Sequence, residues 1–134
     1  MITARRLNRW RQFAAGNQIM MKLDVILSIK PLMEDYSIWI EAEEWEAGQW
    51  DPANCNSDVL VIFSNGTAWA AKFFAYRNVA TLSENNRRSG ECLQGGYFWA
   101  SNMILIDELT RARVEAVVSE LLANHEFELV FSAS

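Results

Sequence analysis

The stretch DVLVIFSNGTAWAAKFFAY (residues 58–76) constrains the fold more than any other part of the chain. Two runs of strand-forming residues flank the pair Asn65-Gly66, which is typical of the type I′ turn that closes a two-residue hairpin loop. We therefore expect two antiparallel strands, with Ser64 opposite Thr67 at the turn.

Both faces of this predicted hairpin are apolar. With this turn Ile62 would face Trp69, and large side chains would repeatedly meet small ones across the two strands. One face carries Leu60, Ile62, Trp69, Ala71 and Phe73, and the other carries Val59, Val61, Phe63, Ala68, Ala70, Phe74 and Tyr76. Because neither face is suited to contact with water, the pattern predicts a sheet that is covered on both sides.

Length and composition predict one domain. The chain has 134 residues, 51% of them hydrophobic, which is enough for a single core and too few for two. Residues 1–20 hold four arginines and no acid, and they end at the pair Met20-Met21. We expect a single domain over 21–134, preceded by an extension that is either disordered or not native, or is a basic arm that contacts a partner or the acidic body.

Charge is unevenly distributed along the chain. The net charge is −5, but residues 21–134 carry eight bases against 17 acids, a net −9. An acidic body repels phosphate backbones and anionic membrane surfaces, so we expect no direct nucleic acid and no membrane among its partners. This charge suits a basic partner, or serves only solubility.

Cysteine usage and hydropathy predict a cytoplasmic protein. Cys55 and Cys92 lack Cys-x-x-Cys spacing, and with a single histidine they do not make an ordinary zinc site, so we expect reduced thiols, no metal and no cofactor. No apolar run approaches about 18 residues, and no signal-peptide core precedes a cleavage site. These absences argue against a membrane span and against secretion.

A helix is predicted over residues 23–36. Five apolar residues follow helical spacing there: Val25, Ile29, Leu32, Met33 and Tyr36. Asp24 is a candidate N-cap, whereas Pro31 interrupts the pattern. We therefore expect a kink or two short helices, which cover one face of the sheet.

The segment that follows has the most unusual composition in the chain. Seven acids and no base lie between Glu34 and Asp51, together with one tyrosine and three tryptophans, and residues 37–42 alternate like a short strand. Either the tryptophans pack into the core below a solvated acidic face, or aromatic anchors and an acidic rim bind a basic partner. The candidate binding residues of the second interpretation are Glu41, Glu43, Glu44, Trp45, Glu46, Trp50 and Asp51.

The chain after the hairpin predicts a helix and then a strand. Residues 77–89 are expected to form a surface helix that has Asn78 as N-cap and ends at Gly90 in the left-handed conformation. Residues 97–107 are apolar on both faces, and we expect them to form a strand that pairs with the hairpin.

The C-terminal part predicts a second helix and a last strand, which together define the fold class. Residues 107–123 form the strongest predicted helix, with Thr110 as N-cap, and residues 126–132 alternate like an edge strand. The predicted fold is α+β, with a mostly antiparallel sheet of four to five strands, an Asn-Gly hairpin, and helices packed on the sheet. A ferredoxin-like plait is the nearest alternative topology.

No combination of residues indicates a reaction. Cys92 and His125 could supply a thiol and a base, but a lone cysteine and a lone histidine are far more often structural. The carboxylates of residues 41–46 could supply an acid and a base, but adjacent acids without a metal-ligand pattern are typical of a solvated surface. We therefore expect no catalytic residues and no enzyme activity.

A family resemblance covers residues 55–125. It rests on a strand, an Asn-Gly turn, an aromatic strand, the run GECL at 90–93 and the run YFWAS at 97–101. The pattern resembles small uncharacterised bacterial immunity proteins of polymorphic and contact-dependent toxin systems. The resemblance implies a cytoplasmic, non-enzymatic inhibitor that binds a cognate toxin protein domain, and the acidic body suits a basic nuclease toxin. The alternative is a small ligand-binding or regulatory domain in which the aromatic sheet surrounds a pocket.

Overall fold

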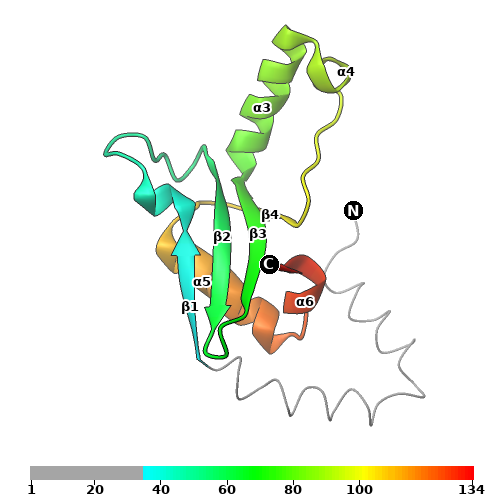
Figure 1. Cartoon of the computed structure of the whole chain (residues 1–134). Helices are drawn as coiled ribbons and strands as arrows, with labels where there is room; N and C mark the ends of the chain where they lie inside the picture. Colours follow the sequence, from blue (N-terminus) through cyan, green and yellow to red (C-terminus); the bar gives the residue numbers. More distant parts are fainter. Residues whose placement is uncertain (1–34) are drawn as a thin grey trace, which may run out of the picture.

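The computed structural model describes residues 35–134, which form one sheet with helices packed on it and a helical arm at one end (Figure 1). The α+β class that the sequence predicts is confirmed. The extension predicted at 1–20 and nearly all of the helix predicted at 23–36 lie outside the described residues. Tyr36 belongs to the first strand instead of that helix.

Five strands form the sheet: β1 (Tyr36–Ile40), β2 (Asn56–Phe63), β3 (Ala68–Ala75), β4 (Met103–Ile106) and β5 (Ser132–Ala133). The first four lie side by side in chain order, and β5 pairs with the same edge of β3 as β4 does. Only the pair of β3 and β4 is parallel among these strands, so the sheet is mostly antiparallel. Strands in chain order do not make a ferredoxin-like plait.

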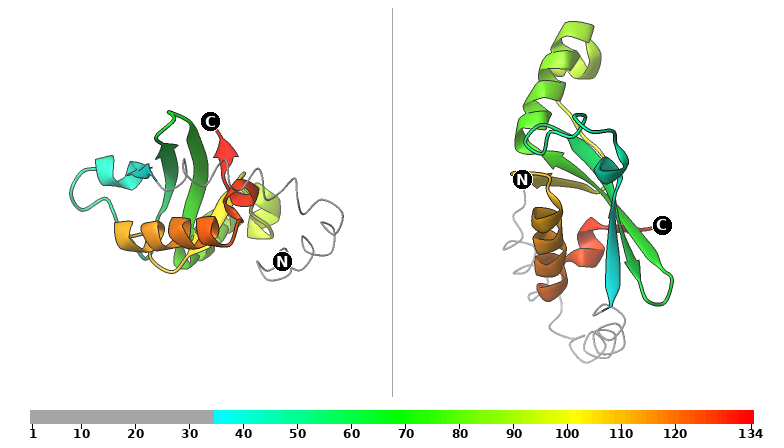
Figure 2. Two further views of the ribbon diagram at one scale, coloured as in Figure 1. Left: turned by 90° about the horizontal axis from the view of Figure 1, so that it is seen from below. Right: turned by 90° about the vertical axis from the view of Figure 1, so that its left-hand side faces the viewer.

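The helical elements lie in two places. They are η1 (Glu41–Glu44), α3 (Tyr76–Ser89), α4 (Glu91–Gly95), α5 (Arg111–Ala123) and α6 (Phe127–Val130). α5 and α6 pack on one face of the sheet, whereas α3 and α4 extend beyond its end (Figure 2). The molecule therefore has a two-layer body and a projecting arm.

The turn between β2 and β3 differs from the predicted type I′ turn. Phe63 N donates to the carbonyl oxygen of Thr67 at 2.9 Å, which encloses a three-residue loop with Gly66 at φ +86°. The Asn65 side-chain oxygen fixes this loop, because it accepts hydrogen bonds from Thr67 N at 3.0 Å and from Thr67 Oγ1 at 2.6 Å. Glycine in the left-handed conformation at the third loop position is the usual form of a three-residue hairpin.

The longer loop shifts the register by one residue and changes which side chains share a face. Val61, not Ile62, lies opposite Trp69. The face that α5 and α6 cover carries buried side chains: Ile40, Val59, Val61, Phe63, Ala71, Phe73, Ile104 and Ile106. Within residues 35–134 helices cover one face of the sheet (Figure 2), and the helix predicted at 23–36 to cover a face lies outside the described residues.

α5 supplies most of that cover. Thr110 is the N-cap that the sequence predicts, since its side-chain oxygen accepts from Arg113 N at 3.3 Å. Val114 and Val118, four residues apart, are fully buried against the sheet. The helix begins at Arg111, later than the predicted start at 107, because Leu109 N instead donates to the carbonyl of Pro52 in the loop before β2.

The edge strand predicted over residues 126–132 is wrong in its first part. Phe127 and Phe131 stack at 4.4 Å between ring centroids, and both lie in the core. A spacing of four residues brings two side chains together on a helix, so the chain forms α6 there and only Ser132–Ala133 remain as strand β5. Leu129, which the strand pattern placed inward, is exposed.

Candidate functional site

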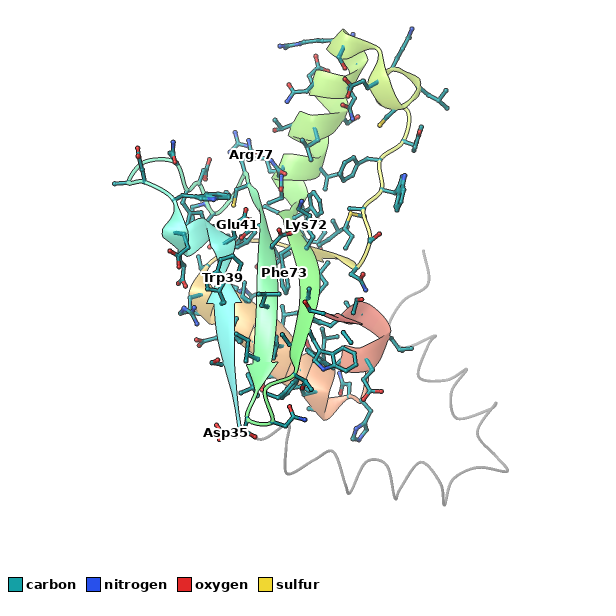
Figure 3. The ribbon with its side chains drawn as sticks, viewed as in Figure 1. Asp35, Trp39, Glu41, Lys72, Phe73 and Arg77 are labelled. Atoms are coloured by element: carbon teal, nitrogen blue, oxygen red, sulfur yellow. The ribbon has the colours of Figure 1, made fainter. Side chains whose placement is uncertain are left out.

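The acidic segment, residues 41–51, follows β1 at the edge of the sheet (Figures 1 and 3). η1 opens it, and the buried Ser57 on β2 holds this turn, because its Oγ accepts a hydrogen bond from Ala42 N at 2.9 Å. Ala42 is itself buried, while Glu43 and Glu44, which follow it in the same turn, are exposed. A fixed turn therefore presents carboxylates to solvent.

Glu43 is engaged within the molecule. Arg111 donates to both carboxylate oxygens, from Nη2 at 2.6 Å and from Nε at 2.8 Å, and also from Nη2 to the carbonyl of Ile38 at 2.9 Å. The hydrogen bonds from Arg111 hold the pKa of Glu43 below its ordinary value, despite some desolvation. Glu43 therefore attaches the acidic segment to α5, because Arg111 is the first residue of that helix. Arg111 also forms an ion pair with Glu115, one turn further along α5, at 3.1 Å.

Trp45 and Trp50 pack against the core and are only partly exposed. Trp50 Nε1 donates to the carbonyl of Leu109 at 3.0 Å, and Leu109 N donates to the carbonyl of Pro52 at 2.8 Å. These reciprocal bonds join the end of the acidic segment to the start of α5. The geometry favours the first interpretation of the sequence for both tryptophans, namely packing below an acidic surface.

The other carboxylates of the candidate set lie at the surface. Glu44, Glu46 and Asp51 are exposed, and Glu41 is partly buried. Glu44 accepts a hydrogen bond from Trp39 Nε1 at 3.3 Å, and Asp51 accepts one from Ala53 N at 3.1 Å. Of the seven candidates, the structure thus brings four carboxylates to one acidic edge, while Glu43 and the two tryptophans hold that edge in place.

The arm, residues 76–102, was missed as a candidate site. It contains α3, α4 and the segment that returns to β4, and it exposes four large apolar side chains: Tyr76 (60%), Leu93 (80%), Tyr97 (50%) and Trp99 (70%). The sequence predicts a strand over 97–107 that would include Tyr97 and Trp99, but β4 is limited to Met103–Ile106. Exposed aromatic side chains are typical of interface anchors.

The base of the arm is held by amide side chains. Asn78, predicted as the N-cap of the helix, lies inside its first turn and is buried. It donates from Nδ2 to Asn54 Oδ1 at 3.1 Å and accepts from Asn56 Nδ2 at 2.9 Å. The N-cap position is Ala75 instead, so Asn78 serves to attach the arm to the loop that follows the acidic segment and to β2.

The tip of the arm has an unusual backbone. Cys92, Leu93 and Gln94 have φ values of +51°, +50° and +56°, a left-handed conformation that costs about 1–2 kcal/mol for each residue with a side chain. Ser83 Oγ donates to the carbonyl of Gly95 at 2.9 Å and so ties this turn to α3. Gly90 ends α3 in the left-handed conformation, as the sequence predicts.

The thiols do not form a catalytic centre with the histidine. Cys92 lies in α4 at the tip of the arm, and His125 lies between α5 and α6 at the other end of the molecule (Figure 1). Cys55 is buried, and this burial raises the pKa of its thiol and disfavours the reactive thiolate.

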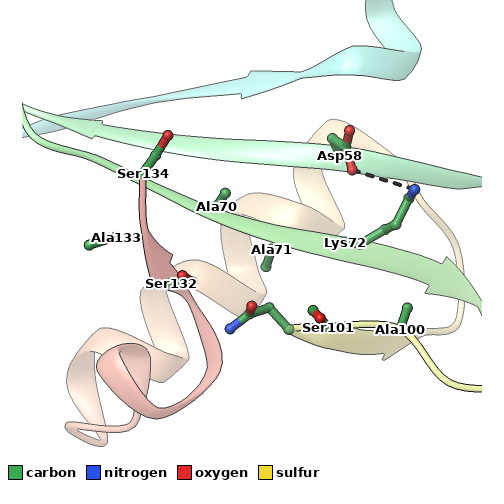
Figure 4. A pocket seen from close by; sticks show the side chains of 10 residues that line it. Asp58, Ala70, Ala71, Lys72, Ala100, Ser101, Ser132, Ala133 and Ser134 are labelled. Carbon is green, nitrogen blue, oxygen red and sulfur yellow. Dashed lines mark ion pairs between the residues drawn. The ribbon is translucent and has the colours of Figure 1, made fainter.

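Two surface hollows flank the sheet. One, of about 440 Å³, lies beside β3 and is lined by small side chains and the Lys72–Asp58 ion pair at 3.8 Å (Figure 4). The other, of about 540 Å³, lies between β1 and α5 beside Arg111. The first hollow is lined by no aromatic side chain and the second by Tyr36 alone, so neither is surrounded by the aromatic side chains of the sheet.

Two further kinds of feature are absent from the described residues, a candidate metal site and a membrane-spanning helix. Within residues 35–134, no group of three or more His, Cys, Asp or Glu side chains could hold a metal ion, and no helix is long and apolar enough to cross a membrane. No family model, curated protein or solved structure matches the chain.

Proposed function

We propose that the protein is a cytoplasmic immunity protein, which binds and neutralises a cognate bacterial toxin domain without catalysis. The observation that carries the proposal is the acidic segment, in which Glu44, Glu46 and Asp51 are exposed on a backbone anchored to the core. A rigid cluster of like charges attracts an oppositely charged surface at long range and fixes its orientation. A basic nuclease domain is a partner of this kind, and the sequence resemblance points to the same class.

The arm supplies the second part of the proposed contact. Charged rim residues mainly increase the rate of encounter, whereas exposed aromatic side chains that become buried contribute most of the affinity. Tyr97 and Trp99 are exposed, and the base of the arm is bonded through Asn78 to Asn54 in the loop that follows the acidic segment. A toxin domain bound at this corner would meet both the carboxylates and the aromatic side chains.

Binding kinetics test the proposal. The protein is co-purified with the product of the neighbouring gene, and association and dissociation rates are measured for the full chain and for Glu44→Lys/Glu46→Lys at several salt concentrations. Glu43 is left in place because it pairs with Arg111. We expect association to slow by about tenfold or more and to lose most of its salt dependence, with little change in the melting temperature.

The matched control is Glu120→Lys/Glu128→Lys, which changes the net charge equally but lies on α5 and α6. If both pairs slow association alike, the effect belongs to net charge and the acidic segment is not the contact surface. If neither pair changes association, or if the neighbouring product does not bind at all, the proposed function is wrong.

A further inference from the structure

The sheet has an uncovered apolar patch on the face opposite α5. We name it the open face, and it consists of one side chain of β1, two of β2 and two of β3: Trp39, Leu60, Ile62, Ala68 and Ala70. Trp39 is 36% and Ile62 is 37% exposed, although both lie within paired strands of the sheet. In residues 35–134, no helix lies over this patch (Figure 2).

The same face is covered near the arm. Phe98 on the returning segment meets Phe74 of β3 edge to face at 5.3 Å, and Phe74 is 2% exposed. One end of this face is therefore packed like a core while the open face beside it is not. Exposed apolar side chains that adjoin a packed layer indicate a surface that another element covers.

We propose that residues 22–34 of this same chain fold back over the open face. The chain enters β1 at Asp35, whose carbonyl accepts from Ser64 N at 3.0 Å, so these residues end at a corner of the open face. Val25, Ile29, Leu32 and Met33 follow helical spacing, which provides one apolar stripe to place against it.

The dimensions agree with this arrangement. Thirteen helical residues would extend about 20 Å, compared with about 17 Å for the five-residue β1 beside which they would run. Pro31 lies four residues before Asp35, where a kink would let the chain turn from β1 onto the sheet. The stripe would then lie across β1, β2 and β3.

A second copy of the chain fits the open face less well. Stable interfaces bury about 800 Å² on each partner, whereas the open face has five side chains, two of them alanine, and none is more than 37% exposed. A segment tethered directly to β1 has a high effective concentration and needs much less contact area. The small patch therefore suits a covering segment of the same chain.

The cover would reach the acidic segment through Trp39. The Trp39 ring belongs to the open face, and its Nε1 donates to Glu44 at the start of the acidic segment. Packing of residues 22–34 on that ring would bury this hydrogen bond and fix the position of Glu44. The inference does not depend on the proposed function, but it gives the N-terminal segment a role in holding the acidic edge.

Cysteine reactivity tests the inference in the full chain. Ala70→Cys places a thiol on the open face without removing its large side chains, in a Cys92→Ser background that leaves Cys55 as a buried internal control. The rate of alkylation at position 70 is measured in three proteins. These are the parent, the variant Ile29→Asp/Leu32→Asp, which disrupts the stripe, and the variant Lys30→Asp. Lys30 lies off the apolar stripe of the predicted helix, and its change alters the net charge by the same −2.

We expect slow alkylation at position 70 in the parent and in Lys30→Asp, and reaction at least about tenfold faster in Ile29→Asp/Leu32→Asp, while Cys55 stays protected in all three. Equal rates at position 70 in the three proteins would overturn the proposal. A protection that increases with protein concentration would assign the face to a second copy instead.

If Cys55 also becomes reactive in the double variant, the fold has opened, and Ile29→Ala/Leu32→Ala replaces it. Faster reaction at position 70 with Cys55 still protected supports the cover, and an unchanged rate contradicts it.

Discussion

The acidic segment and the arm differ in how firmly they are attached to the core, and their compositions suggest the reverse of what is observed. The acidic segment is rich in charge, yet Trp45 and Trp50 anchor it to the core. The arm returns to the sheet through the apolar run YFWA, yet Tyr97 and Trp99 are exposed. The polarity of a segment therefore does not predict how firmly the segment is attached to the core, because this attachment depends on a few side chains that reach the core.

The attachments differ in number and in depth. Ser57, Trp50 and Arg111 connect the acidic segment to β2, to the start of α5 and to α5 itself. The arm is attached at its base by Asn78 and by the Phe98–Phe74 contact, and beyond that α3 and α4 mainly contact each other. We expect the acidic segment to unfold with the core and the arm to open locally at lower free energy.

The largest difference should follow from removing one tryptophan in each region. Trp50→Ala removes a ring packed against the core and a hydrogen bond, so we expect a loss of about 3 kcal/mol in the free energy of unfolding. Trp99→Ala removes an exposed ring and should change it by about 0.5 kcal/mol or less. Urea denaturation measures both. A stable Trp50→Ala variant with weakened binding to the proposed toxin partner would return Trp50 to the role of an interface anchor.

Two serines give a second comparison with a smaller effect. Ser57→Ala leaves the buried Ala42 N–H without its acceptor, which we expect to cost about 1–3 kcal/mol of global stability. Ser83→Ala removes the donor to the Gly95 carbonyl, and exchange of amide hydrogens should accelerate in the arm alone. Equal loss of global stability in both variants would mean that the arm unfolds together with the body.

The sequence predicted the elements whose signal is local. The Thr110 N-cap, the left-handed Gly90 after α3 and the hairpin connection at Asn65-Gly66 all depend on residues within one turn of each other. The register of the hairpin failed because two and three residues are both allowed loop lengths for Asn-Gly. Packing made that choice, since the observed register places Val61 and Trp69 on the face that α5 and α6 cover.

The sequence predicted an exposed acidic surface but not the roles of the individual residues in it. An acidic run rich in tryptophan was sufficient to single out residues 41–51. That Glu43 pairs with Arg111, 68 residues away, depends on the packing of α5 beside β1 and has no local signal. The exposure of Trp99 could not be predicted either, because an apolar run bounded by glycines is also typical of a buried strand.

Two glycines test how the tip of the arm is held. Gly90 and Gly95 have φ values of +85° and +80°, so alanine is unfavourable at both by about 1 kcal/mol. At Gly90 the added methyl group meets nothing within 4 Å, whereas at Gly95 it would lie 2.3 Å from the Ser83 carbonyl oxygen. Gly95→Ala should therefore displace α4 from α3 and increase amide exchange in the arm by about tenfold over Gly90→Ala. Equal exchange would show that this close approach does not hold the tip.

The smallest expected effect is the pH dependence of the Glu43–Arg111 pair. Because Arg111 holds the folded-state pKa of Glu43 below the ordinary value of 4.5, the pair stabilises the fold above pH 4.5 and loses this contribution as the pH falls through the lower, folded-state pKa. Glu43→Gln should be less stable than the parent at pH 7, by at most about 1 kcal/mol since the pair is partly solvated, and the difference should vanish in acid.

Denaturation midpoints of the two proteins between pH 2.5 and pH 7 measure this difference, with about 1 M salt as a second condition that should reduce it. Glu46→Gln is the matched control, because it removes the same charge from the acidic segment without touching Arg111. A control that loses as much stability as Glu43→Gln would mean that the clamp contributes nothing specific. In that case the acidic segment would be held by Ser57 and Trp50 alone, and its contrast with the arm would rest on buried contacts only.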